Sequence, residues 1–270
     1  MKPTVSQPYG PLSSFVDYFW TFDWPRNEAV GQVRTMKMFA TGVSGILFQH
    51  HDGRPALGAN GGCATSFLYG KRTRPSQTTF NGPFALTGVV FKPQGLGRLL
   101  NTQPVAINDG SVPLKDFSND KIGERLLNAR SQRERIALLD RYLRARVDRS
   151  GPEDLLVTES LCLIHDRIRS IRVPQLLKQL NVSERQFERR FVRAVGVSPH
   201  NYIRIARFRK ALRLIKAHRF ERLSDIAYDL NFVDQSHFIK DVKAFSGYTP
   251  GNLIETVRAG IELPCALILP

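Results

Sequence analysis

The sequence contains little cysteine and no long apolar run. Its three cysteines, Cys63, Cys162 and Cys265, are widely spaced and form no C-x-x-C pair. A disulfide framework and a cysteine zinc site are therefore disfavoured, and a reducing cytoplasm fits best. No apolar stretch approaches the ~18–20 residues of a membrane span, and none follows the N-terminal lysine as in a secretory signal. We expect no membrane association, no metal and no cofactor.

Acidic residues are scarce relative to basic ones. Lys and Arg number 39 against 24 Asp and Glu, which gives a net charge of +15 and a pI near 10.2. The excess is concentrated, because residues 167–222 carry 16 basic and 3 acidic side chains. This distribution predicts one binding surface for nucleic acid in that part of the chain.

Composition divides the chain into two domains. Short β-branched and aromatic segments at 42–50, 64–70 and 84–93 lie between Gly- and Pro-rich turns, which predicts a β-rich domain over 1–150. Its end, about 120–148, is helical in pattern. Residues 122–147 suit either a helix packed on its own domain or a dimerisation helix. The breaker at 150–152 marks the boundary with a helical domain over 151–258, followed by a tail over 259–270.

An internal repeat dominates the basic half. Residues 180–199 and 230–250 both begin Leu-Asn and end Gly-x-x-Pro, and a short amphipathic segment precedes each, at 173–180 and 224–230. Each unit is thus predicted as helix, turn and second helix. Residues 201–218, with apolar positions at helical spacing, are expected to form one long helix between the units. Its rise of about 27 Å approaches the ~34 Å between successive turns on one face of B-DNA.

The residues at the helix ends agree with this reading. Asn181 and Asn231 tolerate the left-handed conformation of a sharp turn. Ser183 and Asp234 are expected to cap the second helices, and Ser224 the helix before the second turn. A glycine at 196 and at 247 closes each unit.

The second helix of each unit shows a polar, mostly basic face. Apolar stripes at Phe187, Phe191 and Val195, and at Phe238, Val242 and Phe245, are assigned to the core. The remaining positions, with the cap Ser183, are the candidate DNA-binding residues: Ser183, Arg185, Gln186, Arg189, Arg190, Arg193, Gln235, Ser236, His237, Lys240 and Lys243. Arg and Lys suit guanine edges, Gln suits adenine, and Ser or His can contact bases or phosphates. The alternative is a basic helix that faces solvent and binds no ligand. The presence of a second copy of the repeat unit makes this alternative much less favourable.

These motifs resemble the DNA-binding domain of the AraC/XylS family of bacterial transcription regulators. The second unit carries the signature most clearly, in these residues: Ile226, Ala227, Leu230, Phe232, Asp234, Gln235, Ser236, Phe238, Lys240, Lys243, Gly247, Thr249 and Pro250. The first unit carries Leu177, Leu180, Asn181, Ser183, Phe187, Arg190, Phe191, Gly196, Ser198, Pro199 and Tyr202. The resemblance implies an α+β protein of two domains, with a β-rich regulatory domain before seven helices that form two helix-turn-helix units.

The resemblance also implies residue roles. Base-reading positions fall on Arg185, Glu188 and Arg189 in the first unit, and on Gln235, Ser236, His237 and Lys240 in the second. Glu188 suits either a cytosine amino group or a neighbouring arginine. Asp241 puts an acid on the second recognition helix, which must turn away or be paired. We therefore expect the first unit to supply more of the phosphate attraction.

The sequence predicts a cytoplasmic, nucleoid-associated bacterial transcription regulator that binds double-stranded DNA, and not an enzyme. The family implies activation, RNA polymerase as partner, and either a small-molecule effector or a homodimer through the N-terminal domain or residues 122–147. One alternative is an architectural DNA-binding protein without an effector. The other, a DNA-targeted enzyme with metal-bound cysteines, is disfavoured by the single cysteine within 1–150.

Overall fold

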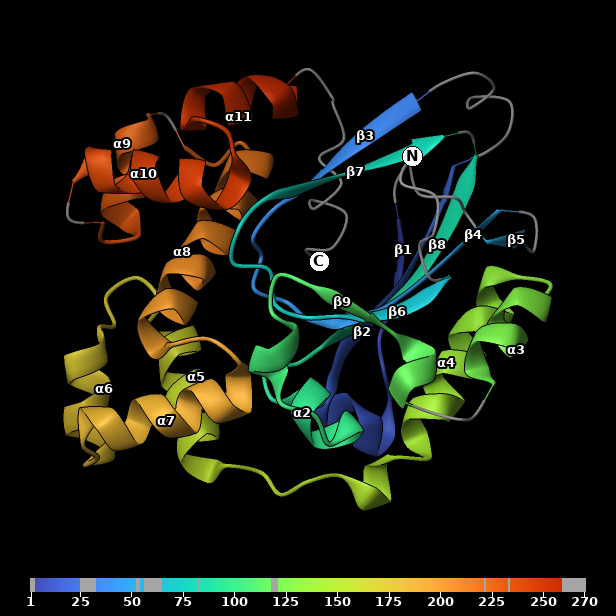
Figure 1. Ribbon diagram of the computed structural model, residues 1–270. Helices are drawn as coiled ribbons and strands as arrows, with labels where there is room; N and C mark the ends of the chain where they lie inside the picture. Colours follow the sequence, from blue (N-terminus) through green and yellow to red (C-terminus); the bar gives the residue numbers. More distant parts are fainter. Residues whose placement is uncertain are drawn as a thin grey trace.

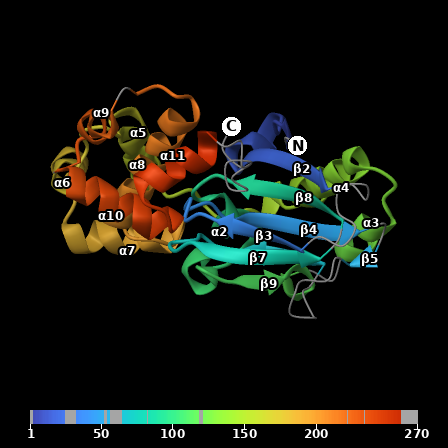
Figure 2. The same ribbon diagram turned by 90° about the horizontal axis from the view of Figure 1, so that it is seen from above.

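The computed structural model describes residues 3–24, 33–51, 54–55, 65–81, 83–117, 121–220, 222–232 and 234–258. Cys63, Cys265 and the predicted tail lie outside these residues, whereas Cys162 is exposed with a free thiol. Within the described ranges, no helix combines the length and the apolar character needed to cross a bilayer. The helical and β-rich parts lie side by side (Figures 1 and 2).

The N-terminal part is β-rich, as predicted, and its main sheet is antiparallel. Its strands are β1 (Thr4–Ser6), β2 (Val16–Trp24), β4 (Gly45–His51), β5 (Arg54–Pro55), β6 (Ser66–Tyr69), β8 (Phe84–Phe91) and β9 (Ser111–Pro113). The order in space is β1-β2-β8-β4-β6-β9, and β5 pairs with β4. A separate pair, β3 (Val33–Met38) and β7 (Ser76–Asn81), forms a second small sheet.

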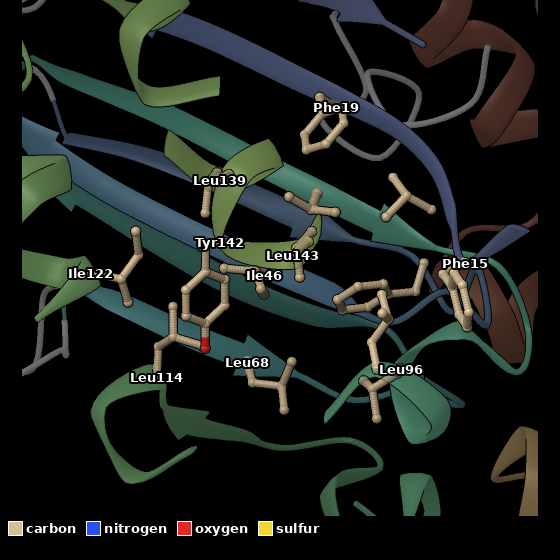
Figure 3. Close-up of a cluster of buried hydrophobic side chains, with 14 of the residues drawn as sticks. Phe15, Phe19, Ile46, Leu68, Leu96, Leu114, Ile122, Leu139, Tyr142 and Leu143 are labelled. Atoms are coloured by element: carbon tan, nitrogen blue, oxygen red, sulfur yellow. The ribbon is translucent and has the colours of Figure 1, made fainter. Parts of the chain in front are cut away.

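Alternation along the strands gives the main sheet two apolar faces. One face carries Phe19, Ile46 and Leu68 and is covered by helices (Figure 3). These helices are α2 (Gly95–Leu100), α3 (Ile122–Asn128) and α4 (Gln132–Arg144), with short 3-10 turns η1 (Gly10–Ser14), η2 (Pro104–Ile107), η3 (Leu114–Phe117) and η4 (Val147–Arg149). The other face carries Tyr18, Trp20 and Phe22.

The helical segment 122–147 is broken rather than continuous. Ser131 caps α4 by accepting a hydrogen bond from the Glu134 backbone N–H, so a new helix begins there. The buried Arg135 guanidinium donates to the carbonyls of Leu126 and Ala129 and so holds the break together. Leu139 and Leu143 are fully buried against the sheet, so the apolar side of α4 is used within its own domain.

Seven helices follow within the described residues, as the resemblance implies. They are α5 (Leu155–Asp166), α6 (Val173–Leu180), α7 (Glu184–Val195), α8 (Pro199–Lys216), α9 (Leu223–Asp229), α10 (Gln235–Ser246) and α11 (Pro250–Arg258). The long helix α8 joins two cores. Ile203 belongs to the core of the first unit, with Phe187 and Phe191. Phe208 and Leu212 belong to the core of the second unit.

The N-terminal part contacts both helix-turn-helix units. Phe39, directly after β3, is only 1% exposed and packs edge-on against Phe208 and Tyr248 in the second core. The neighbouring Ala40 N–H donates to the Phe245 carbonyl at 2.8 Å. At the first unit, the Asn108 side chain donates to the Gly196 carbonyl at 2.5 Å. The sheet domain therefore holds α7 and α10 at separate points.

A lysine is buried close to this junction. Lys71 is 2% exposed, and its Nζ donates to the Pro93 carbonyl at 3.3 Å. None of the carboxylates in the described residues forms an ion pair with it. Burial, reinforced by the positive charge of Arg209, lowers the pKa of Lys71 to about 7.

We expect Phe39→Ala to lower the free energy of unfolding by about 3–5 kcal/mol, because it removes a buried ring from the second core. Urea denaturation of the full chain measures this. Tyr228→Ala is the matched control, since Tyr228 is 81% exposed and its loss should cost under about 0.5 kcal/mol. If Phe39→Ala lowered the free energy of unfolding by no more than the control does, the Phe39 ring would add nothing to the stability of this core.

The lowered pKa of Lys71 also predicts how the free energy of unfolding depends on pH. Its pKa falls from 10.5 in the unfolded chain to about 7 in the folded protein, so between these values the unfolded chain binds more protons. The free energy of unfolding should therefore rise with pH across this window. Lys71→Met should remove this contribution, so its stability advantage over the wild type should be largest near pH 7 and shrink towards pH 10. Parallel pH curves for the two proteins would contradict this assignment.

Candidate DNA-binding surface

The first unit folds as its end residues predict. Asn181 ends α6 with φ 48°, and Gly196 ends α7 with φ 96°, both in the left-handed region. Between them, Ser183 caps α7 by accepting from the Gln186 backbone N–H at 3.4 Å. The turn and the start of α7 are therefore fixed locally, which sets where the recognition helix begins.

The two sides of α7 differ as predicted. Phe187, Phe191 and Val195 are fully buried. Five candidate positions of this unit are exposed: Ser183, Arg185, Gln186, Arg189 and Arg193. Glu188 is exposed too, and no ion pair joins it to an arginine of the described residues. The exposed side of α7 thus presents three guanidinium groups and one amide for phosphates and base edges.

Arg190 differs from its neighbours. Its guanidinium forms two hydrogen bonds to Asp154, at 2.5 and 2.9 Å, and its side chain is only 36% exposed. Burial alone would raise the pKa of Asp154, but the hydrogen bonds from Arg190 and from the Val157 N–H outweigh it, so the pKa is lowered. Arg190 ties α7 to the start of α5, so a DNA contact by Arg190 requires this pair to open.

The second unit follows the same plan with one correction. Asn231 lies in the turn with φ 52°, Asp234 caps α10 by accepting from the His237 N–H at 2.7 Å, and Gly247 ends the helix with φ 74°. The expected cap at Ser224 is wrong. The cap lies two residues earlier, at Arg222, because Asp225 accepts a hydrogen bond from the Arg222 N–H at 2.7 Å.

The exposed side of α10 is polar but less basic. Gln235, Ser236, Lys240 and Lys243 are exposed, whereas His237 is partly buried. The His237 ring packs edge-on against Phe232, with ring centres 5.6 Å apart, which limits its reach towards DNA. Ile239, 36% exposed, adds an apolar side chain that the sequence reading had not singled out.

Asp241, the acid that opposes DNA binding, is turned inward and paired. It is 1% exposed, and the Arg204 guanidinium of α8 donates to it at 2.6 and 3.3 Å. Its charge is therefore neutralised inside the domain rather than presented to DNA. Arg204 was not among the residues predicted from the sequence. The signal that could have found it is Asp241 itself, because an acid on the buried side of an amphipathic helix needs a basic partner.

The two recognition helices share one side of the molecule. Helix α8 has the predicted length of 18 residues and spans about 27 Å, but it begins and ends two residues before the predicted range 201–218. Figure 2 shows α7 and α10 along the same side of the C-terminal domain, with α5 on the opposite side. Among the described residues, no group of three or more His, Cys, Asp or Glu side chains could hold a metal ion.

Comparison with known families agrees with this geometry. A family described as "Helix-turn-helix domain" matches residues 176–256, which spans both units. A second family, "Domain of unknown function (DUF6597)", matches residues 4–113 of the sheet domain. No curated protein is significantly similar to the sequence.

Among solved structures, the chain is similar to ToxT from Vibrio cholerae. One ToxT structure is 14% identical with a TM-score of 0.47, over 83% of this chain and 97% of that one. A second, bound to (E)-4-(8-methylnaphthalen-1-yl)but-3-enoic acid, is 12% identical with a TM-score of 0.46, over 84% and 98%. A third, with an unsaturated fatty acid bound, is 14% identical with a TM-score of 0.42, over 83% and 94%. The likeness to these structures is distant.

The two capped helices with polar, basic faces define a helix-turn-helix DNA-binding protein. Paired units that are joined by one long helix and preceded by a β-rich domain are the arrangement that the resemblance to the AraC/XylS family implies. The chain is a DNA-binding transcription regulator, with the helix-turn-helix family matched over residues 176–256.

The buried pair predicts a stability difference between two arginines. Arg204→Met should lower the free energy of unfolding by about 3–5 kcal/mol, because it leaves the buried Asp241 carboxylate without its guanidinium partner and with only the His237 ring nearby, at 3.8 Å. Adding Asp241→Asn should restore part of the loss. Arg193→Met, an exposed residue without an ion-pair partner in the described chain, should change stability by less than about 0.5 kcal/mol. Urea denaturation measures all four proteins, and equal losses for the two arginine variants would contradict the buried pair.

Proposed function

We propose that this regulator binds duplex DNA with α7 and α10 in successive major-groove segments. The observation that carries the proposal is the placement of both recognition helices along one side of the C-terminal domain (Figure 2). Each helix has exposed polar side chains and is fixed by its own cap and core. Arg185 and Arg189 would read guanine, and Gln235 would read adenine. The remaining candidates would contact either phosphates or base edges. They are Ser183, Gln186, Arg190, Arg193, Ser236, His237, Lys240 and Lys243.

We further propose that residues 1–150 regulate the DNA-binding domain 151–258. Support comes from the contacts of the sheet domain with both units, at Phe39 and at Asn108. The small acids bound in two ToxT structures make a small-molecule effector a reasonable expectation here. We also propose that the protein activates transcription, contacts RNA polymerase and forms a homodimer through the sheet domain or residues 122–147. Its proposed location is the cytoplasm, in association with the nucleoid.

The main test is binding of the full protein to the DNA upstream of its own gene, against an unrelated fragment of equal length, across a salt series. A specific regulator should prefer the upstream fragment at physiological salt, and footprinting should then give the half-site spacing. Equal binding to both fragments, with a steep salt dependence, would favour the architectural alternative.

The exposed faces predict unequal contributions from the two units. Arg189→Ala should weaken binding to the cognate fragment by about 1–3 kcal/mol, and by more than Lys240→Ala, because α7 presents more basic groups than α10. Gel shifts at fixed salt measure both variants. Lys92→Ala, exposed on the sheet domain, is the control and should bind as the wild type does. Equal losses, or a larger loss for Lys240→Ala, would overturn this ranking.

A further inference from the structure

The last residues of both recognition helices lie against loops of the sheet domain. Helix α7 ends at Gly196, whose carbonyl accepts a hydrogen bond from the Asn108 side chain at 2.5 Å. Gly196 is also so close to Pro104 that a Cβ added to it would come within 2.9 Å of the Pro104 side chain. Helix α10 ends at Gly247, where an added Cβ would lie 3.7 Å from Pro75. One domain therefore reaches the ends of both helices.

These two loops are tied together into one strip, residues 71–75 and 104–109, which we call the bridging strip. The Asp109 carboxylate accepts hydrogen bonds from the Thr73 N–H and the Thr73 hydroxyl, both at 2.6 Å, and from the Arg74 N–H at 3.3 Å. Asp109 is the one acid in the strip, and three donors share its charge. The backbone at Arg74 is thus held in place.

The strip carries three basic side chains, of which one is exposed and has no partner. Lys71 is buried, and the Arg72 guanidinium donates to the Ser76 hydroxyl at 2.7 Å. Arg74 is exposed, and among the described residues no carboxylate forms an ion pair with it. Its guanidinium is therefore available to an anionic partner outside the protein.

The strip lies on the side of the molecule that carries the recognition helices. Figure 1 shows the segment between β6 and β7 between the ends of α7 and α10, and Figure 2 shows it on the same side as both helices. Arg193 and Lys243, exposed in the last turns of α7 and α10, extend the basic surface towards the strip from either helix. The strip thus fills the interval between two surfaces proposed to enter DNA.

This interval corresponds to a particular part of the DNA. Two helices in successive major-groove segments on one face of B-DNA leave a minor groove between them. Phosphates of both strands border that groove, and arginine pairs with phosphate through two parallel hydrogen bonds. A fixed, unpaired arginine between the helices therefore matches the charge and the position of these phosphates.

We propose that the sheet domain itself binds DNA, through contact of Arg74 with the phosphates that border the minor groove between the two recognition helices. The contact rests on the proposed function, because it needs α7 and α10 in successive major-groove segments. It reads no bases and adds affinity on any sequence. Because the strip is placed by its packing on both units, the contact also makes DNA affinity depend on docking of the sheet domain.

The first experiment is a gel shift of the full chain with the upstream fragment and with an unrelated fragment, across a salt series. Arg74→Ala should weaken binding to both by about threefold to tenfold, and the slope of log affinity against log salt should become shallower by about one. Arg74→Lys keeps the charge and should recover most of the loss. A loss for Arg74→Ala on the upstream fragment alone would overturn the phosphate assignment.

Arg125→Ala is the matched control. Arg125 is also an exposed arginine of the sheet domain, but it lies on α3, at the end away from the DNA-binding domain (Figure 2). It should bind both fragments as the wild type does, and both arginine variants should melt at the wild-type temperature. Equal DNA affinities of Arg74→Ala and Arg125→Ala would overturn the contact, since net charge alone would then explain any change.

Hydroxyl-radical footprinting locates the contact, because these radicals attack the DNA backbone from the minor groove. At saturating protein, the wild type should protect the backbone between the two major-groove segments. Arg74→Ala should lose protection there and keep it elsewhere. Unchanged protection in Arg74→Ala would overturn the position proposed for Arg74.

Asp109 is a positioning residue in this proposal, and its removal gives a test of opposite sign. Loss of an acid near phosphates would by itself strengthen DNA binding, whereas release of the Arg74 backbone should weaken it. We expect Asp109→Ala to weaken binding about twofold to threefold, and to add no weakening to Arg74→Ala in the double variant. Tighter binding by Asp109→Ala, or additive losses, would overturn the positioning role.

The same gel shifts separate this inference from the proposed function. Weaker binding by Arg189→Ala with wild-type binding by Arg74→Ala would overturn the contact of the bridging strip and retain the proposed function. Wild-type binding by Arg189→Ala and Lys240→Ala with weaker binding by Arg74→Ala would overturn the placement of the two recognition helices, and would leave a DNA contact of the sheet domain.

Discussion

The rigid helix α8 is the constraint on which the arrangement of the molecule depends. It gives Ile203 to the first core, and Ile205, Phe208 and Leu212 to the second, so neither unit can shift along the helix without opening a core. A single helix of 18 residues also fixes the distance between the two units. Two recognition helices thus act as one binding surface, although each forms within its own small helical unit.

The sheet domain is attached to this assembly at points that belong to different units. Phe39 enters the core of the second unit, and the Asn108 side chain bonds the end of α7 in the first. A change in the sheet domain can therefore alter α7 and α10 through separate contacts. Gly42, packed against Ile205, adds a third contact at α8 itself. Regulation through such contacts needs only small shifts, because packed cores resist gradual deformation.

Two acids beside the recognition helices are paired with arginines. Asp241 is buried and pairs with Arg204, and the partly buried Asp154 pairs with Arg190. Arg185, Arg189 and Arg193 stay exposed on α7, together with Glu188. Pairing removes repulsion from the DNA-facing side and links α10 to α8, and α7 to α5.

The sequence by itself determined the local structure of the two units: the turns at Asn181 and Asn231, the caps at Ser183 and Asp234, and the buried stripes of α7 and α10. These features depend on residues within a few positions of each other, where capping and helical periodicity act. Only the tertiary structure decided the partners of Arg190 and Arg204, which lie 36 and 37 residues away, and the entry of Phe39 into the second core. The start of α9 and the start of α4 are local as well, because each is set by a capping bond between residues three positions apart that the sequence interpretation did not include. Pairing between distant residues depends on how the cores pack, which local patterns do not specify.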